Sequence, residues 1–336
     1  MGKLPKLLFL AALLAPTAPP AHSLAAPKDS DRDGLSDSVE DALLARFAPT
    51  FMVSRTDCSV APAQFAREKK TPTAIADDGT IYGQAFPQKG SSKLVELHYY
   101  HLWRRDCGEM GHALDTEHVS ALIEVDGDPD SAKALDWYAA AHEDTVCDAS
   151  HLARASTLGA LDRGATVWIS AGKHASFLTE ELCTHGCGED RCEQMEKLQV
   201  RAIVNLGESQ APMNEISWLR SGEWPLESKM ERSDFSETRL ARVNRLPPTE
   251  IAWANPSKRP AQATISGVSA GIGGAATGGR AADTALAVAD GKTDSALDAA
   301  TDNTGRSLKA TAKNVWKSLK ASAQKTVDFL SDSKNK

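Results

Sequence analysis

Four ionisable side chains lie within seven residues in the stretch GHALDTEHVSALIEVDG, residues 111–127: His112, Asp115, Glu117 and His118. In an extended chain, Asp115 and Glu117 point to the same face as the apolar residues from Val119 onward, and His118 points to the other face. Burying charge without a partner costs free energy. Three arrangements would offset this cost: a bound cation, a catalytic proton relay, or a cluster of salt bridges.

A divalent cation, Ca²⁺ or Mg²⁺, held by His112, Asp115 and Glu117 would neutralise the two carboxylates. The competing hypothesis is a hydrogen-bonded salt bridge to Arg104 or Arg105. A second stretch, VWISAGKHASF, places His174 at the tip of a small-residue turn after an expected strand. Asp106, His118 and His174 are candidates for a possible additional site.

The stretch DSDRDGLSDSVE, residues 29–40, has the spacing of a calcium loop. Acids occupy positions one, three, five, nine and twelve, Gly34 stands at position six, and position seven offers a backbone carbonyl. Oxygen ligands at these steps can surround a hard cation. The predicted Ca²⁺ ligands are Asp29, Asp31, Asp33, Leu35, Asp37 and Glu40. An acidic linker that caps the following helix is the alternative.

The first 25 residues have a basic start, a short apolar stretch and a small-residue cleavage site, as in a secretory signal peptide. We therefore expect a secreted, periplasmic or cell-surface protein. In such a compartment an even number of cysteines favours disulfides over a thiolate zinc site. The six cysteines are Cys58, Cys107, Cys147, Cys183, Cys187 and Cys192.

Charge and composition divide the chain further. The net charge is −7, but residues 303–336 and the signal peptide are basic, so the part between them carries about −15. An acidic body disfavours nucleic-acid binding and suits cations. A Gly/Ala-rich linker is expected over 256–302, and a basic amphipathic helix over 303–336. That helix would lie either on an anionic membrane or on the protein's own acidic body.

Residues 41–255 carry the alternating apolar runs of one domain, which follows the calcium-binding loop at 26–40. The pattern predicts a mainly β fold, a two-layer antiparallel, jelly-roll-like β-sandwich with a few peripheral helices. Strands are expected at Thr80–Phe86, Leu94–Trp103, Glu117–Val125, Ala165–Ser170 and Leu198–Leu206, and helices at Ser38–Phe47, Ser131–His142 and Asn214–Arg220.

HALDTEHV and VWISAGKHASF resemble the H-x-x-D-W-E-H-V and V-Y-V-S-x-G-x-H-A-S-Y motifs of the vacuolar protein sorting-associated protein sixty-two family, and LLARFAPTF resembles its opening. The first motif is also similar to the G-H-R-H-D-W-E heptapeptide of necrosis- and ethylene-inducing peptide-like cytolysins. The N-terminal loop resembles bacterial thrombospondin type 3-like repeats. The cytolysin resemblance implies a β-sandwich with a cation site at His112, Asp115 and Glu117, joined by Asp106. Thr116 and Leu114 depart from the cytolysin motif.

These features predict an exported divalent-cation-binding β-sandwich protein that engages a membrane surface or a glycan. The first alternative is a metal-dependent hydrolase with Glu117 as general base and His174 as acid. No G-x-S-x-G, H-E-x-x-H or G-x-x-x-x-G-K-[ST] signature is present, so a binding protein is favoured over an enzyme. The second alternative is a purely structural secreted domain.

Overall fold

The computed structural model describes residues 27–258, apart from 109–110, 185, 188–189, 225 and 231. The predicted signal peptide and the basic tail lie outside the described residues, as does the linker beyond Lys258.

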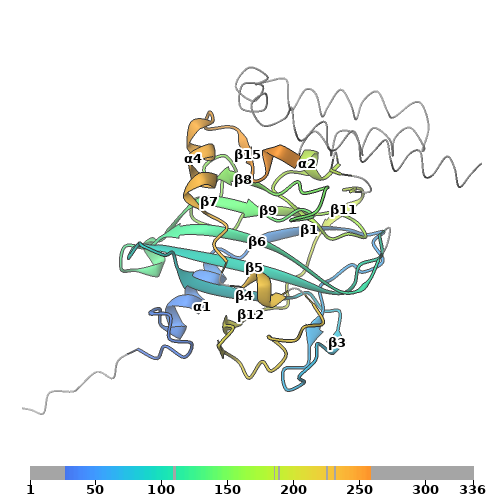
Figure 1. Ribbon diagram of the computed structural model, residues 1–336, viewed down its shortest axis with the longest axis horizontal. Coiled ribbons are helices and arrows are strands. Elements are labelled where there is room, and N and C mark those ends of the chain that lie inside the picture. Colours follow the sequence, from blue (N-terminus) through green and yellow to red (C-terminus); the bar gives the residue numbers. More distant parts are fainter. Residues whose placement is uncertain are drawn as a thin grey trace, which may run out of the picture.

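Two β-sheets form the body of the molecule (Figure 1). The larger sheet has seven strands in the order β12 (Ala202–Asn205), β4 (Thr80–Pro87), β5 (Leu94–Arg105), β6 (Ala113–Glu124), β7 (Lys133–Ala139), β8 (His151–Arg154) and β15 (Ile251–Trp253). The smaller sheet has the order β10 (Ser176–Phe177), β9 (Thr166–Ile169), β1 (Thr50–Ser54) and β11 (Met195–Lys197). Neighbouring strands are antiparallel except in the pairs β12–β4 and β1–β9, which are parallel.

Short elements surround the sheets. Two small hairpin-like pairs are β2 (Gln64–Phe65) with β3 (Ala74–Ala76) and β13 (Gly207–Glu208) with β14 (Ala211–Pro212). The helices are α1 (Asp37–Arg46), α2 (Glu180–Thr184), α3 (Leu226–Lys229) and α4 (Glu237–Arg245), with 3₁₀ turns at Pro129–Ser131 and Pro256–Lys258. No helix among the described residues has the length and apolar character needed to cross a bilayer.

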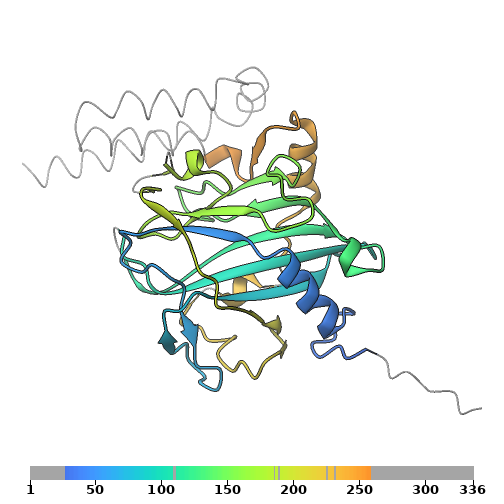
Figure 2. The same ribbon diagram turned by 180° about the vertical axis from the view of Figure 1, so that it is seen from behind.

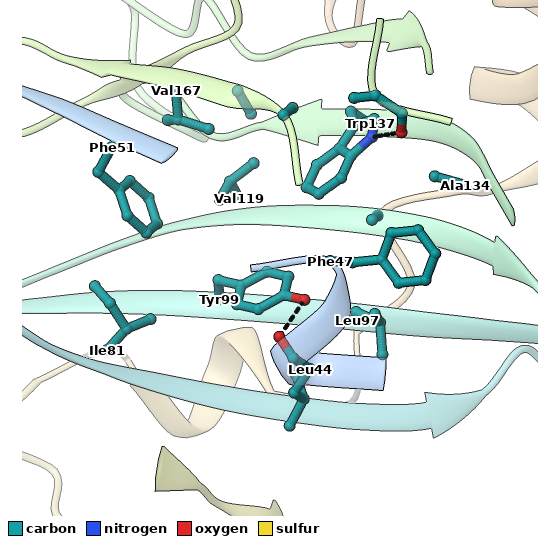
Figure 3. Packing of buried hydrophobic residues seen from close by; sticks show 14 of the residues in the cluster. Leu44, Phe47, Phe51, Ile81, Leu97, Tyr99, Val119, Ala134, Trp137 and Val167 are labelled. Atoms are coloured by element: carbon teal, nitrogen blue, oxygen red, sulfur yellow. Dashed lines mark hydrogen bonds between the residues drawn. The ribbon is translucent and has the colours of Figure 1, made fainter. Parts of the chain in front are cut away.

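The two sheets pack face to face over one large apolar core, which confirms the predicted β-sandwich (Figure 2). Phe51 and Val167 of the smaller sheet face Tyr99, Val119 and Trp137 of the larger one (Figure 3). Two buried polar atoms in this core are satisfied by backbone carbonyls. The Tyr99 hydroxyl donates to Leu44 O over 3.1 Å, and the Trp137 indole donates to Ala160 O over 3.4 Å. Both buried donors are therefore paired within the core.

The outer face of the larger sheet is also covered, although its sequence is rich in polar residues. Leu122, Tyr138 and Leu152 on this face pack against Phe235 and Val243 from the segment that includes α4. A second apolar cluster joins Tyr82, Tyr100 and Leu102 to Trp218 and Trp224. Strands β5 and β6 are consequently buried on both faces along most of their length.

All six cysteines form disulfides, which confirms the disulfide prediction. The pairs are Cys58–Cys107, Cys147–Cys187 and Cys183–Cys192. A thiolate zinc site at these cysteines is thereby excluded. Three disulfides are typical of a protein that folds in an oxidising compartment, as expected for an exported chain.

The structure corrects three expected elements. Ser131–His142 is not helical, because residues 133–139 pair with β6 and β8 as strand β7 and place Trp137 in the core. Asn214–Arg220 forms turns rather than a helix. The expected strand Leu198–Leu206 is only four residues long (β12), since the chain before it crosses between the sheets. Leu198 lies in the inter-sheet core, and Leu206 lies in the outer cluster.

Candidate functional site

Asp115 and Glu117 lie at the start of strand β6, on the face that Val119 continues into the core. Trp103 and His101 of β5 stand opposite them in register. Both carboxylates are buried just beneath the surface, 7% and 9% exposed respectively. Because side chains alternate between the two faces of a strand, both acids lie on the core-facing side of β6, near the edge of the core, as the sequence predicts.

His174 pairs with Asp115. The imidazole is fully buried, and its Nδ1 lies 2.9 Å from Asp115 Oδ2, while Nε2 faces Asp57 Oδ2 at 3.7 Å. The Trp103 ring stacks on the imidazole with a centroid separation of 3.9 Å. Although burial alone would lower it, the pKa of His174 rises to about 9 because two carboxylates flank the ring. His174 is therefore an imidazolium at neutral pH, enclosed by an Asp–His–Asp arrangement.

This arrangement bears on two of the sequence hypotheses. The partner of Asp115 is His174 rather than an arginine, and Arg104 instead pairs with Asp77 over 3.1 Å. Both nitrogens of His174 face carboxylates in a fully buried position. A proton donor to substrate must reach the reacting group, so the structure does not favour His174 as a general acid.

Glu117 is the least compensated acid of the site. Its Oε2 atom is buried and has no hydrogen-bond partner among the described residues. Burial raises the pKa of Glu117 to about 8, an effect that Lys229 opposes and Asp115 reinforces. Without a bound ion, this side chain holds a proton at neutral pH. A cation that displaced the proton would satisfy the unpaired oxygen.

Sequence reasoning missed His142, whose charge acts on Glu117, and its partner Asp190. His142 lies in the turn after β7, and its Nε2–H donates to both carboxylate oxygens of Asp190, at 2.8 Å to Oδ1 and 2.7 Å to Oδ2. Burial opposes the effect, but the charges of Asp190 and Glu117 raise the pKa of His142 to about 9. The Cys147–Cys187 disulfide links the segment that carries His142 to the segment that carries Asp190. In the sequence, only these cysteines could have indicated that the two segments lie close together.

His112 and Asp106 lie at the exposed rim. The His112 side chain is 59% exposed, and its Nε2 lies 3.7 Å from Asp106 Oδ2. Asp106 is already paired with Lys173 at 2.9 Å. The Cys58–Cys107 disulfide fastens the Asp57 loop to the Asp106 loop. Among the described residues, His112 does not share a compact ligand cluster with Asp115 and Glu117. His118 lies on the opposite face of the sheet, as the strand period predicts.

Strained backbone marks the same region. Leu114, His142 and His174 have φ values of 60°, 52° and 54°, in the left-handed region that favours glycine. Such conformations cost free energy and persist where the surroundings fix them, often at functional sites. Their clustering around Asp115 and Glu117 supports a site at this end of the sandwich.

The N-terminal loop gathers three of its predicted ligands. One oxygen from each of Asp29, Asp31 and Asp33 lies within 4.8 Å of the others. Both Asp31 oxygens and one oxygen each of Asp33 and Glu40 are buried, and none of these atoms has a hydrogen-bond partner among residues 27–258 as far as they are described. Burial raises the pKa of Asp33 to about 6 and that of Glu40 to about 8.

The remaining loop residues are placed differently. Asp37 accepts hydrogen bonds from Ser30 and Lys28, which turns its carboxylate to the start of the loop. The Leu35 side chain packs against the core. Gly34 has φ 99°, which allows the turn that the spacing requires.

No family model and no curated protein matches the chain. Solved structures with a similar architecture are necrosis- and ethylene-inducing-protein folds at low identity. An NLPPya triple mutant is 14% identical, with a TM-score of 0.40 over 62% of this chain and 95% of its own. NLPPya in complex with glucosamine is 13% identical, with a TM-score of 0.34 over 64% and 89%.

Necrosis and ethylene inducing protein 2 from the agent of cocoa's witches' broom disease is 16% identical, with a TM-score of 0.32 over 54% and 80%. At these values the similarity assigns neither a family nor an activity.

Proposed function

We propose that this protein is an exported binding protein that uses a divalent cation at Asp115 and Glu117 to engage a sugar-bearing surface, either a glycan or a glycosylated membrane headgroup. The observation that carries the proposal is the buried Glu117 oxygen, which has no hydrogen-bond partner in the described structure and lies next to a second carboxylate. A doubly charged ion is the partner that would satisfy both acids.

Calcium or magnesium suits these ligands because both are hard cations that prefer carboxylate oxygens. Both ions keep open coordination positions for waters or ligand oxygens. Sugar hydroxyls can fill such positions, so the ion would connect the protein to a polyhydroxylated surface. His112, exposed at the rim, is the predicted third ligand and would join only if its side chain turned inward.

We further propose that the N-terminal loop binds a separate, structural Ca²⁺. Its support is the set of buried, unpartnered oxygens on Asp31, Asp33 and Glu40. Glu40 belongs to α1, whose Leu43 and Leu44 enter the inter-sheet core, so this ion would fix the N-terminus to the sandwich.

Cation binding at Glu117 is expected to release a proton. The test is titration calorimetry of the mature protein with CaCl₂ or MgCl₂ at pH 7. Buffers of different ionisation enthalpy report the number of protons released, and one equivalent of cation should release close to one proton. Glu117→Gln should weaken that equivalent at least about tenfold, since one carboxylate ligand is lost. Glu124→Gln, an exposed position on the same strand, serves as the control.

Binding to an immobilised glycan array, and co-sedimentation with glycolipid or phosphatidylcholine vesicles, should then be compared in calcium and in chelator. We expect the protein to be retained on the array or on glycolipid vesicles in calcium, and we expect Glu117→Gln to lose this retention. Equal cation affinity in Glu117→Gln and Glu124→Gln would contradict the site. Equal retention in calcium and in chelator would contradict the role of the ion.

A further inference from the structure

A second cluster of metal-ligating side chains lies on the outer face of the larger sheet, apart from the proposed cation site. It contains His98 of β5, His118 of β6 and Asp234 from the segment before α4, each with a ligand atom within 4.8 Å of the others. All three side chains are fully buried. Glu96 and Ser120, also buried, complete the surroundings.

The hydrogen bonds leave one position of this cluster uncompensated. Glu96 Oε2 accepts from the Asp234 backbone N–H at 3.1 Å and faces His98 Nε2 at 3.4 Å. The His98 proton therefore belongs on Nε2, and Nδ1 presents a lone pair. That lone pair faces Asp234 Oδ2 at 3.6 Å, and within the described part of the chain His98 Nδ1 has no hydrogen-bond partner. Two acceptors thus face each other in a site without water access.

Among the described residues, a positively charged arginine lies near only one carboxylate oxygen of this cluster. Arg239 approaches the other Asp234 oxygen, Oδ1, at 3.4 Å. Oδ2 receives the Ser120 hydroxyl at 2.7 Å and lies 2.9 Å from His118 Nε2. Among the described residues, Glu96 has no lysine or arginine partner. The approach of Asp234 Oδ2 to the bare His98 Nδ1 is costly in a buried position unless a cation lies between these two atoms.

The separations suit a small transition-metal ion. Ligand atoms around a tetrahedral zinc with bonds of about 2.0 Å lie about 3.3 Å apart. The observed separations from Asp234 Oδ2, 2.9 Å to His118 and 3.6 Å to His98, bracket that value. We propose that His98 Nδ1, His118 Nε2 and Asp234 Oδ2 form a buried binding site for Zn²⁺ or a similar transition metal.

The protonation states agree with this assignment. Burial lowers the pKa of His118, so its imidazole is neutral at pH 7. Its Nε2–H donates to Asp234 Oδ2, and binding of a metal at Nε2 would move that proton to Nδ1. Against the effect of burial, the imidazoles and the Ser120 hydroxyl hold the pKa of Asp234 well below its usual value, so the carboxylate is ionised. Glu96 would act as the outer partner that fixes the His98 tautomer.

Metal at this position would fasten the segment 226–245 to the sheet. The same segment carries Lys229, which donates to the Thr116 carbonyl and whose charge opposes the raised pKa of Glu117. The metal would therefore hold in place a positive charge that faces the cation site on the other side of β6. The two sites remain chemically distinct, because the outer cluster offers two imidazole nitrogens and one carboxylate oxygen, whereas the Asp115 and Glu117 site offers chiefly carboxylate oxygens.

Cobalt provides a direct test, since Co²⁺ at a tetrahedral nitrogen–oxygen site absorbs visible light far more strongly than six-coordinate Co²⁺ at an oxygen-rich site. Zinc retained by the purified mature protein is first measured by elemental analysis. The protein is then stripped of metal with chelator and titrated with CoCl₂ in excess calcium. We expect one cobalt equivalent with visible bands, displaced by zinc. Asp234→Asn and His98→Gln should lose it.

Two controls keep the result specific. His101→Gln changes a fully buried histidine on the opposite face of β5, whose nitrogens contact Ser176 and Trp103, and should retain the bands. Glu117→Gln should also retain them. Absence of bands in the folded wild-type protein, with no zinc retained, would overturn the site and leave a protonated histidine as the charge between the carboxylates. Bands that persist in Asp234→Asn would overturn the ligand set.

Discussion

Calcium-free protein is expected to become less stable as the pH rises from about 4.5 to 8, and calcium is expected to reverse that loss. The pKa of Glu40 in the folded loop is about 8 and that of Asp33 about 6, both raised by burial and by neighbouring acids. Over this range the folded state holds protons that the unfolded state has released. The free energy of unfolding therefore falls as the pH rises.

Calcium replaces those protons, so its stabilising effect should be largest above pH 8 and should disappear near pH 5. At about 1,000 times the dissociation constant, a ligand of the folded state contributes about 4 kcal/mol. Urea unfolding of the mature protein at several pH values, with CaCl₂ or with chelator, measures the difference.

Two substitutions separate the loop from other buried acids. Glu40→Gln should abolish most of the calcium effect while keeping an oxygen that can accept the Asn205 hydrogen bond. Asp136→Asn removes another buried acid, with a pKa of about 6, far from the loop in sequence, and should leave the calcium effect intact. A calcium effect of the same size in Glu40→Gln would show that the loop does not bind the ion.

The second large effect is expected from His174→Gln, which should destabilise the chelator-treated protein by about 3 kcal/mol at pH 6. The change removes the positive charge between Asp115 and Asp57 and leaves two buried carboxylates without it. The folded-state pKa of His174 is about 9, above its ordinary 6.5. Its contribution is therefore complete below pH 6.5 and is lost as the pH rises through 9.

The difference between His174→Gln and wild type should accordingly shrink toward zero above pH 9, as measured by urea unfolding from pH 6 to 10. His101→Gln is the matched control, because burial lowers the pKa of His101 well below its usual value and the ring is neutral. The loss of stability caused by His101→Gln should not change between pH 8 and 10. A pH-independent cost for His174→Gln would mean that the imidazole is not charged in the folded protein.

Neutral hydrogen-bonded histidines elsewhere show why the charged one stands out. His101 Nδ1 accepts from the Trp103 indole at 2.8 Å, so the proton on Nε2 donates to the Ser176 hydroxyl. That tautomer cannot take a proton from the serine, so this Ser–His pair is structural rather than nucleophilic. Composition alone does not separate such histidines from His174, because the distinction depends on which groups face the ring nitrogens.

The sequence by itself determined the features that depend on local spacing. The two-residue period of a strand put Asp115 and Glu117 on one face and His118 on the other, and the structure has this arrangement. The loop spacing from Asp29 to Asp33 brought three carboxylates together. Six cysteines in an exported chain predicted disulfides, and they form. Each of these results follows from chain geometry or redox chemistry over short distances.

Only the tertiary structure decided which distant groups meet. Residues 133–139 became a strand because β6 and β8 offered free edges on both sides, which outweighed the helical spacing of the isolated segment. His98 and His118 occupy alternating polar positions typical of a solvent-facing strand, yet Asp234 from more than a hundred residues later buries them. Such contacts depend on long-range packing, and no local period encodes which segment will cover a sheet face.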